Sequence, residues 1–269
     1  MKGPIVVDTR WLAEHGNDAD VRIVDVRPPP FYAQGHLPGA VNLPMFLLAN
    51  PAAGAPDVEL VSSRLGNAGI SRDTHVVAYD DGIGPTAAQL FWVLAYLRHP
   101  RASVLDGGIT RWAHEGRGWE YTHNRVTPAT YAAEGPDLHV LATLEDVRAA
   151  IDSDDAVILD VRTPSEYLGL RRTAGRNGHV PGAVNIDWQD NLSAGNDDIP
   201  RLLDDRELHL MYESAGVTPD KLVLVHCQTG VRSSETFMVL KELGYPRVAN
   251  YVAGWQEWGN RTDTPVESA

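Results

Sequence analysis

The chain has 269 residues, of which 43% are hydrophobic and 22% are charged, and its formal net charge is −13. This length fits two domains of ordinary size, each able to bury its own core. The acidic balance argues against a nucleic-acid partner, since no basic stripe with interleaved aromatic residues accompanies it. Neither a long apolar run nor an opening signal-peptide pattern occurs, so we expect a cytoplasmic protein with no membrane partner.

Cysteine and histidine usage narrows the chemistry further. Cys227 is the only cysteine, which excludes an intramolecular disulfide and every multi-cysteine zinc site. The ten histidines include no pair at the spacing of a helical metal-ligand motif, so we predict no metal site. Without a second cysteine to resolve an oxidised one, disulfide exchange within one chain is excluded as well.

Two phrases recur in the same order along the chain. A short apolar strand at residues 21–25 is followed by GHLPGAVN at 35–42, and a similar strand at 157–162 is followed by GHVPGAVN at 178–185. An internal repeat of this kind is stronger evidence for two like domains than length is.

The two copies continue in step after these phrases. Residues 74–79 mirror 221–226, and helices are predicted over 87–97 and 233–243. Asp80 stands in the first copy where Cys227 stands in the second. Because both halves alternate strands with helices, we predict an α/β fold with two like domains, each a parallel sheet with helices on both faces.

The predicted domain boundaries follow this duplication. The first domain spans residues 1–123 and the second spans residues 138–269. Residues 124–137 carry two prolines, a glycine and several small residues without periodicity, which is typical of a linker. Thr143 is predicted to cap the first long helix of the second domain, with acidic residues in its first turn.

One basic insertion distinguishes the copies. Asp25 and His36 are 11 positions apart, whereas Asp160 and His179 are 19 positions apart. The extra residues include Arg171, Arg172 and Arg176. A solvated loop and a substrate-binding loop both fit this pattern, so both interpretations stay open.

The segment around Cys227 carries the candidate chemistry. An apolar run at 222–225 predicts a central parallel strand that ends near His226. The tight turn before the next helix is formed by Gln228, Thr229, Gly230, Val231 and Arg232. Its glycine can adopt a positive φ and let successive N–H groups converge. A helix N-terminus, converging N–H groups and a nearby cation each lower a thiol pKa from its usual value of about 8.5, so we predict a thiolate nucleophile.

Other interpretations of this segment carry less weight. A lone cysteine often acts as a small buried hydrophobe, but the carboxyl end of a parallel strand is where open α/β sheets bind ligands. His226 points away from its neighbour by strand alternation, so it is interpreted as structural and not as a general base. Four residues separate Cys227 from Arg232, one fewer than in cysteine phosphatases, which favours sulfur transfer over phosphoryl transfer.

These phrases resemble the rhodanese family of sulfurtransferases in its tandem-domain form. The resemblance rests on DVR and GHxPGAVN in both halves, VLDGG before Trp112, CQTGVRS at 227–233 and GWQEWG near the end. It implies that the first domain is catalytically inactive, with Asp80 at the cysteine position. It also implies that Cys227 takes sulfur from a small anionic donor as a persulfide and passes it to cyanide or another thiophilic acceptor, without a metal or organic cofactor.

The resemblance leaves the donor between thiosulfate and 3-mercaptopyruvate. The loop departs from the CG(S/A)GVT pattern of mercaptopyruvate enzymes, and Glu166 stands where many tandem members have arginine. Arg172 lies at about the distance from His179 at which mercaptopyruvate enzymes hold another arginine, so we predict that it binds substrate together with the loop residues 228–232. We favour thiosulfate.

A non-catalytic binding module and a cysteine phosphatase are less favoured alternatives to a sulfurtransferase. For the oligomeric state, we expect a monomer or a weak homo-oligomer.

Overall fold

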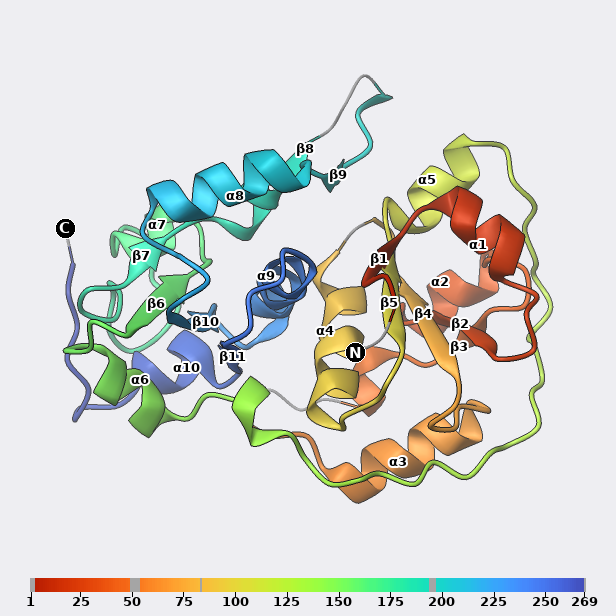
Figure 1. Cartoon of the computed structure of the whole chain (residues 1–269), viewed down its shortest axis with the longest axis horizontal. Helices are drawn as coiled ribbons and strands as arrows, with labels where there is room; N and C mark the ends of the chain where they lie inside the picture. Colours follow the sequence, from red (N-terminus) through yellow and green to blue (C-terminus); the bar gives the residue numbers. More distant parts are fainter. Residues whose placement is uncertain (1–2, 49–53, 83, 194–196, 269) are drawn as a thin grey trace. The chain divides into compact units, whose positions relative to one another are not determined.

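The computed structural model describes residues 3–48, 54–82, 84–193 and 197–268 (Figure 1). The chain forms two compact units. The first comprises Met1–Asn50, Pro56–Asp137 and Ser193–Leu202, and the second comprises Pro51–Ala55, Leu138–Leu192 and Leu203–Ala269. Each unit has its own sheet and its own hydrophobic core, as the duplication in the sequence predicts.

The first unit is built on a five-stranded sheet in the order β1-β5-β4-β2-β3, in which every pair is parallel. The central strand β4 is buried at all five positions, as expected for a parallel strand covered on both faces, and after His75 its residues are apolar or aromatic. The strands are β1 (Val6–Val7), β2 (Val21–Asp25), β3 (Val41–Asn42), β4 (His75–Tyr79) and β5 (Ala102–Leu105).

Helices lie on both sides of this sheet, with α4 on one side and α1 and α2 on the other (Figure 1). Their bounds are α1 (Thr9–His15), α2 (Pro29–Ala33), the 3-10 helix η1 (Met45–Leu47), α3 (Val58–Asn67), α4 (Pro85–Tyr96) and α5 (Gly108–His114).

The second unit has a four-stranded parallel sheet in the order β11-β10-β6-β7. Its strands are β6 (Ala156–Asp160), β7 (Val184–Asn185), β10 (Leu222–His226) and β11 (Val248–Tyr251). Its helices are η3 (Leu138–Val140), α6 (Leu144–Ala150), α7 (Pro164–Tyr167), η4 (Trp188–Asn191), α8 (Asp205–Ser214), α9 (Val231–Glu242) and α10 (Gly254–Trp258). The short strands β8 (Leu192–Ser193) and β9 (Arg201–Leu202) pair with each other.

The repeated DVR phrase builds the same buried ion pair in each unit. Arg27 donates to Asp25 at 2.6 Å and Arg162 donates to Asp160 at 2.6 Å, in each case at the carboxyl end of a strand. A buried carboxylate needs such a partner, because its desolvation would otherwise be very costly. The repeated phrase therefore fixes the loop that leaves the strand.

The repeated aromatic and histidine positions also coincide in structure. Tyr32 stacks on His36 and Tyr167 stacks on His179, each with ring centroids 3.7 Å apart. These matched details confirm the duplication and the α/β fold of two parallel-sheet domains.

The strands and helices that the sequence predicts by range are present, as β2, β4, β6, β10, α4 and α9. The predicted cap at Thr143 is confirmed, because its hydroxyl accepts from the N–H of Asp146 and the Asp146 carboxylate reaches back to the Thr143 N–H. In the part of the chain that the structure describes, none of the helices has the length and apolar character that a membrane span requires.

Candidate active site

Cys227 follows the central strand of the second unit. Strand β10 pairs with β6 on one side and β11 on the other, which brings His226 level with Asp160 and Tyr251. The thiol lies one residue beyond, at the carboxyl edge of the sheet, and the residue is only 1% exposed. The nucleophile predicted from the sequence is thus buried at the edge where parallel sheets bind ligands.

The loop after Cys227 turns directly into helix α9. Gly230 precedes the helix with φ of +81°, the left-handed conformation that glycine adopts without a steric penalty. A Cβ at Gly230 would lie 2.8 Å from the Cα of Val252, so the space also excludes a larger residue. The sequence prediction of a glycine with positive φ is confirmed.

The first turn of α9 presents backbone N–H groups at this loop. The helix bonds begin with the N–H of Ser234 donating to the carbonyl of Gly230 at 3.2 Å. The carbonyls of Cys227 and Gln228 instead accept from the N–H groups of Trp255 and Gln256, at 2.8 and 2.9 Å. The N–H groups that open an α-helix have no intrahelical acceptor, which makes this turn suited to an anion.

A hydroxyl contacts the sulfur atom, and a cation interacts with it electrostatically. The Oγ of Ser233 lies 3.5 Å from the Cys227 Sγ and 2.7 Å from Oδ1 of Asn250 in β11. The negative charge of a Cys227 thiolate would also favour the guanidinium of Arg232, since Cys227 is among the groups that raise the pKa of Arg232. A hydroxyl and a cation therefore face any negative charge that develops on the sulfur.

Arg232 is held by a carboxylate from helix α7. Its Nη1 donates to Oε2 of Glu166 at 2.7 Å, and its Nη2 donates to Oε1 at 3.0 Å. Burial raises the pKa of Glu166, but the hydrogen bonds and charge of Arg232, together with the hydrogen bonds from Thr163, outweigh it and lower that pKa to about 2. Burial likewise opposes the charge on Arg232, while Glu166 and Cys227 raise the pKa of Arg232 overall.

His226 belongs to a buried structural network. Its Nε2 lies 3.7 Å from Oδ2 of Asp160, which is itself paired with Arg162. Burial lowers the pKa of His226 although Asp160 opposes this shift, so the neutral form of the ring is favoured. This placement agrees with the interpretation of His226 as structural.

The basic insertion meets the loop through Gln228. The Nε2 of Gln228 donates to the carbonyl of Thr173 at 2.9 Å and to Oε1 of Gln256 at 3.1 Å. Arg172 is exposed, and its guanidinium donates to the carbonyls of Ala174 and Gly175 within its own loop. The structure therefore brings Cys227 and Arg232 together, whereas the hydrogen bonds of Arg172 are made inside the insertion, and its role in binding substrate stays a prediction.

The remaining loop residues lie beside the glycine that precedes α9. Thr229 and Val231 are half-buried on either side of Gly230. A role in substrate binding also stays a prediction for the loop residues Gln228, Thr229, Gly230, Val231 and Arg232.

In the first unit, the carboxylate of Asp80 lies at the position that corresponds to Cys227. Its Oδ1 accepts from the N–H groups of Gly82 and Gly84 at 3.1 and 3.0 Å, and its Oδ2 accepts from Ala87 at 3.0 Å. Burial raises the pKa of Asp80 to about 6 despite these bonds. The carboxylate thus occupies, with its own side chain, the N–H groups of the turn that leads into α4.

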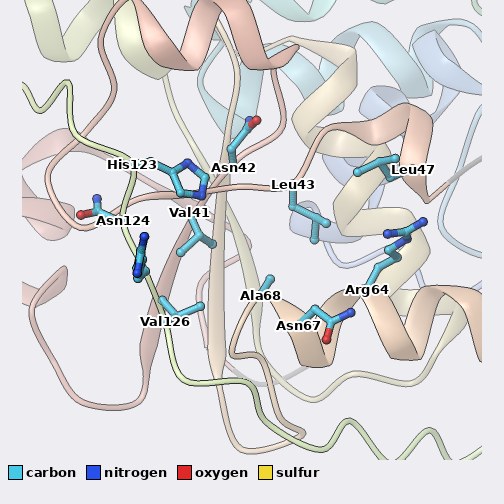
Figure 2. Close-up of a pocket in the computed structure, with 11 residues that line it drawn as sticks. Val41, Asn42, Leu43, Leu47, Arg64, Asn67, Ala68, His123, Asn124 and Val126 are labelled. Carbon is cyan, nitrogen blue, oxygen red and sulfur yellow. The ribbon is translucent and has the colours of Figure 1, made fainter.

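A separate pocket of about 410 Å³ lies in the first unit. Figure 2 shows Arg64 and Asn67 on one side and His123, Asn124 and Val126 on the other. None of its lining residues belongs to the Cys227 loop, so it is distinct from the candidate active site.

Sequence reasoning missed three parts of the site. Ser233 and Asn250 were not singled out, and Glu166 was noted only for the arginine it replaces. The phrase CQTGVRS contains Ser233 and could have indicated it, but the contacts of Asn250 and Glu166 depend on the fold. Among the residues that the structure describes, no cluster of three or more His, Cys, Asp or Glu side chains could hold a metal ion.

Each half of the chain matches the same family of known proteins. The Rhodanese-like domain family matches residues 8–115 and 143–261. A "Thiosulfate sulfurtransferase" of Pseudomonas aeruginosa is 35% identical over 98% of this chain and 97% of its own length. A "3-mercaptopyruvate sulfurtransferase" of Escherichia coli is 29% identical over 97% of both chains.

Solved structures show the same fold. An anaerobic ergothioneine biosynthesis enzyme from Chlorobium limicola superposes with a TM-score of 0.87 at 22% identity, covering 98% of this chain and 70% of that one. At this identity the likeness concerns the fold alone. With a matching domain in each half and sulfurtransferase relatives along nearly its whole length, the chain belongs to the tandem-domain rhodanese family and is a sulfurtransferase.

Proposed function

We propose that this sulfurtransferase moves the sulfane sulfur of thiosulfate to cyanide or another thiophilic acceptor through a persulfide on Cys227. The observation that carries the proposal is the placement of Cys227 in the turn that leads into α9, with the Ser233 hydroxyl in contact with its sulfur and Arg232 favoured electrostatically by Cys227. The thiosulfate sulfurtransferase from Pseudomonas aeruginosa, similar over nearly the whole chain, supports this choice of donor.

The reaction divides into two displacements at sulfur. The Cys227 thiolate attacks the outer sulfur of thiosulfate, the sulfur–sulfur bond of the donor breaks, and sulfite leaves with the bonding electron pair. Cyanide then attacks the outer sulfur of the persulfide, the bond to Sγ breaks, and thiocyanate leaves while the thiolate is restored. Both steps pass through an anionic sulfur, which the N–H groups of the first helical turn and Arg232 can stabilise.

The alternative donor is 3-mercaptopyruvate, with the same persulfide on Cys227. The similar Escherichia coli protein bearing that name supports it, and so would a role for Arg172 in binding a carboxylate. Thiosulfate and 3-mercaptopyruvate carry different charged groups beside the sulfur that is transferred. The charged side chains around Cys227 therefore determine which donor the enzyme prefers.

Mass spectrometry with turnover tests the proposal. Incubation with thiosulfate should add one sulfur atom to Cys227, and cyanide should then release it as thiocyanate. Cys227→Ser should lower turnover to below about 0.1% of wild type, as loss of a covalent nucleophile does. A wild-type protein that gains no sulfur from thiosulfate, or a Cys227→Ser protein with near-normal turnover, would refute it.

A further inference from the structure

Arg232 interacts electrostatically with Cys227, yet the two terminal nitrogens of its guanidinium already bind a carboxylate. Both oxygens of Glu166 meet the two terminal nitrogens of the guanidinium, at 2.7 and 3.0 Å. This paired geometry is the one in which arginine recognises a planar carboxylate ligand. Glu166 therefore occupies the edge of the cation that a substrate carboxylate would otherwise use.

Glu166 is fixed in this position. The residue is 3% exposed, and its Oε2 also accepts from the N–H and hydroxyl of Thr163, at 3.2 and 2.9 Å. Its low pKa of about 2 keeps the carboxylate charged throughout the physiological range. The neighbouring carboxyl of Asp187 has a raised pKa, chiefly because it is buried and also because of Asp190 and Glu166, while Arg232 opposes that rise.

The duplication offers an internal comparison. In the half that lacks the cysteine, Phe31 stands before Tyr32, where Glu166 stands before Tyr167. Pro85 stands five residues after Asp80, where Arg232 stands five residues after Cys227. Both members of the pair thus occur in the half with the nucleophile, and both are replaced in the half without it.

We propose that Glu166 determines donor specificity, acting as an internal carboxylate ligand of Arg232 that disfavours sulfur donors carrying a carboxylate. A donor such as 3-mercaptopyruvate must compete with Glu166 for Arg232. Thiosulfate does not need a planar carboxylate site, because its oxygens can accept from the N–H groups of the first helical turn. This inference rests on the proposed sulfur transfer and names the feature that selects its donor.

The test is Glu166→Gln, which keeps the size of the side chain and removes its charge. The ratio of kcat/KM for 3-mercaptopyruvate to kcat/KM for thiosulfate should rise by about tenfold or more, the effect of one charge-assisted hydrogen bond. Pyruvate, which carries the carboxylate but no transferable sulfur, should bind the variant about tenfold more tightly in calorimetry. In an Arg232→Gln background, the same change at Glu166 should leave pyruvate affinity unaltered, because Glu166 acts through the arginine.

Two control variants separate this role from structural ones. Asp146 accepts hydrogen bonds from Thr143 at the start of α6, as Glu166 does from Thr163 at the start of α7. Asp146→Asn removes this carboxylate charge, and among the described contacts no arginine pairs with Asp146. Asp155 forms a similar bidentate ion pair with Arg247, in which both hydrogen bonds are 2.9 Å long. Asp155→Asn weakens this pair just before the start of β6, at the edge of the sheet opposite to Cys227. Neither control should change the donor ratio or pyruvate binding.

The outcomes distinguish this inference from the function on which it rests. Unchanged pyruvate affinity and an unchanged donor ratio in a folded Glu166→Gln protein overturn the specificity role. If the wild-type protein forms no persulfide with either donor, the proposed function fails, and the pyruvate titration still decides whether Glu166 blocks Arg232.

Discussion

At the scale of single residues, one buried carboxyl lies on the same helix as Arg232. Glu235 is fully buried, and its Oε2 accepts from Nδ2 of Asn191 at 2.9 Å and from Oγ1 of Thr236 at 3.2 Å. Asn191 is held in turn by the hydroxyl of Tyr212 at 2.6 Å. Burial raises the pKa of Glu235 to about 8, because these neutral donors compensate only part of the cost of a buried charge.

Glu235 should make the stability of the protein fall as pH rises. Between its usual pKa of 4.5 and its folded pKa of about 8, the folded protein keeps the proton that the unfolded chain releases. The free energy of unfolding should therefore decrease by up to about 1.4 kcal/mol per pH unit in this window. Glu235→Gln should lose this component, so its stability relative to wild type should rise from pH 5 to pH 8 in urea unfolding.

The exposed Glu207 in the first turn of α8 provides the matched control. Glu207→Gln should give a stability difference from wild type that is nearly constant over the same pH range. A pH-independent difference for Glu235→Gln would show that its carboxyl is ionised in the folded protein.

At the scale of elements, helix α9 has a left-handed glycine at each end. Gly230 before it and Gly244 after it both have φ of +81°. Their surroundings differ, because a Cβ at Gly230 would meet Val252 at 2.8 Å, whereas a Cβ at Gly244 would meet nothing within 4 Å. One glycine thus shapes the turn around Cys227, and the other ends the helix.

Alanine at these two positions should separate backbone strain from steric damage to the site. Gly244→Ala should lose about 1–2 kcal/mol of stability, the cost of a left-handed conformation for a residue with a Cβ, and keep its activity. Gly230→Ala should lose more stability and at least about tenfold in kcat/KM, because Val252 and the loop must move apart. Urea unfolding and thiocyanate production measure the two effects, and equal activity in the two variants would contradict the argument.

The elements themselves are largely predictable from sequence, and the long-range contacts of the site are not. The run at 222–225 and the glycine at 230 act locally, so the strand, the turn and the start of α9 follow from them. Glu166 and Arg232 are 66 positions apart, and Ser233 and Asn250 are 17 apart. Their contacts depend on the strand order β11-β10-β6-β7, which no local pattern specifies.

At the scale of the whole molecule, the two units share a scaffold but their turns differ in conformation. The residue before α9 is left-handed, whereas Gly84 before α4 is extended, with φ of −91° and ψ of 161°. The duplication was visible in sequence, including Asp80 at the cysteine position. Counting from Asp80 and Cys227, Ile83 stands where Gly230 stands and Gly84 stands where Val231 stands, so the sequence also indicates that the two turns differ, although not which conformation Gly84 adopts.

This difference predicts that a nucleophile placed in the first unit will not restore activity. In the double variant Asp80→Cys with Cys227→Ser, the new thiol would follow β4, but the position of Arg232 is taken by Pro85, which has neither a cation nor an N–H group. The new thiol should also lack the turn shape set by a left-handed glycine. We therefore expect no sulfur gain at residue 80 with thiosulfate and less than about 1% of wild-type thiocyanate production.

Circular dichroism and a thiol count in denaturant would establish that the double variant folds and carries its cysteine. Loss of the three N–H bonds to Asp80 should cost about 1–3 kcal/mol of stability, and Asp80→Ala with Cys227→Ser controls for that loss. Persulfide on residue 80 would mean that a strand-end thiol suffices for sulfur transfer. Its absence in a folded protein would mean that the reaction also needs Arg232 and the turn before α9.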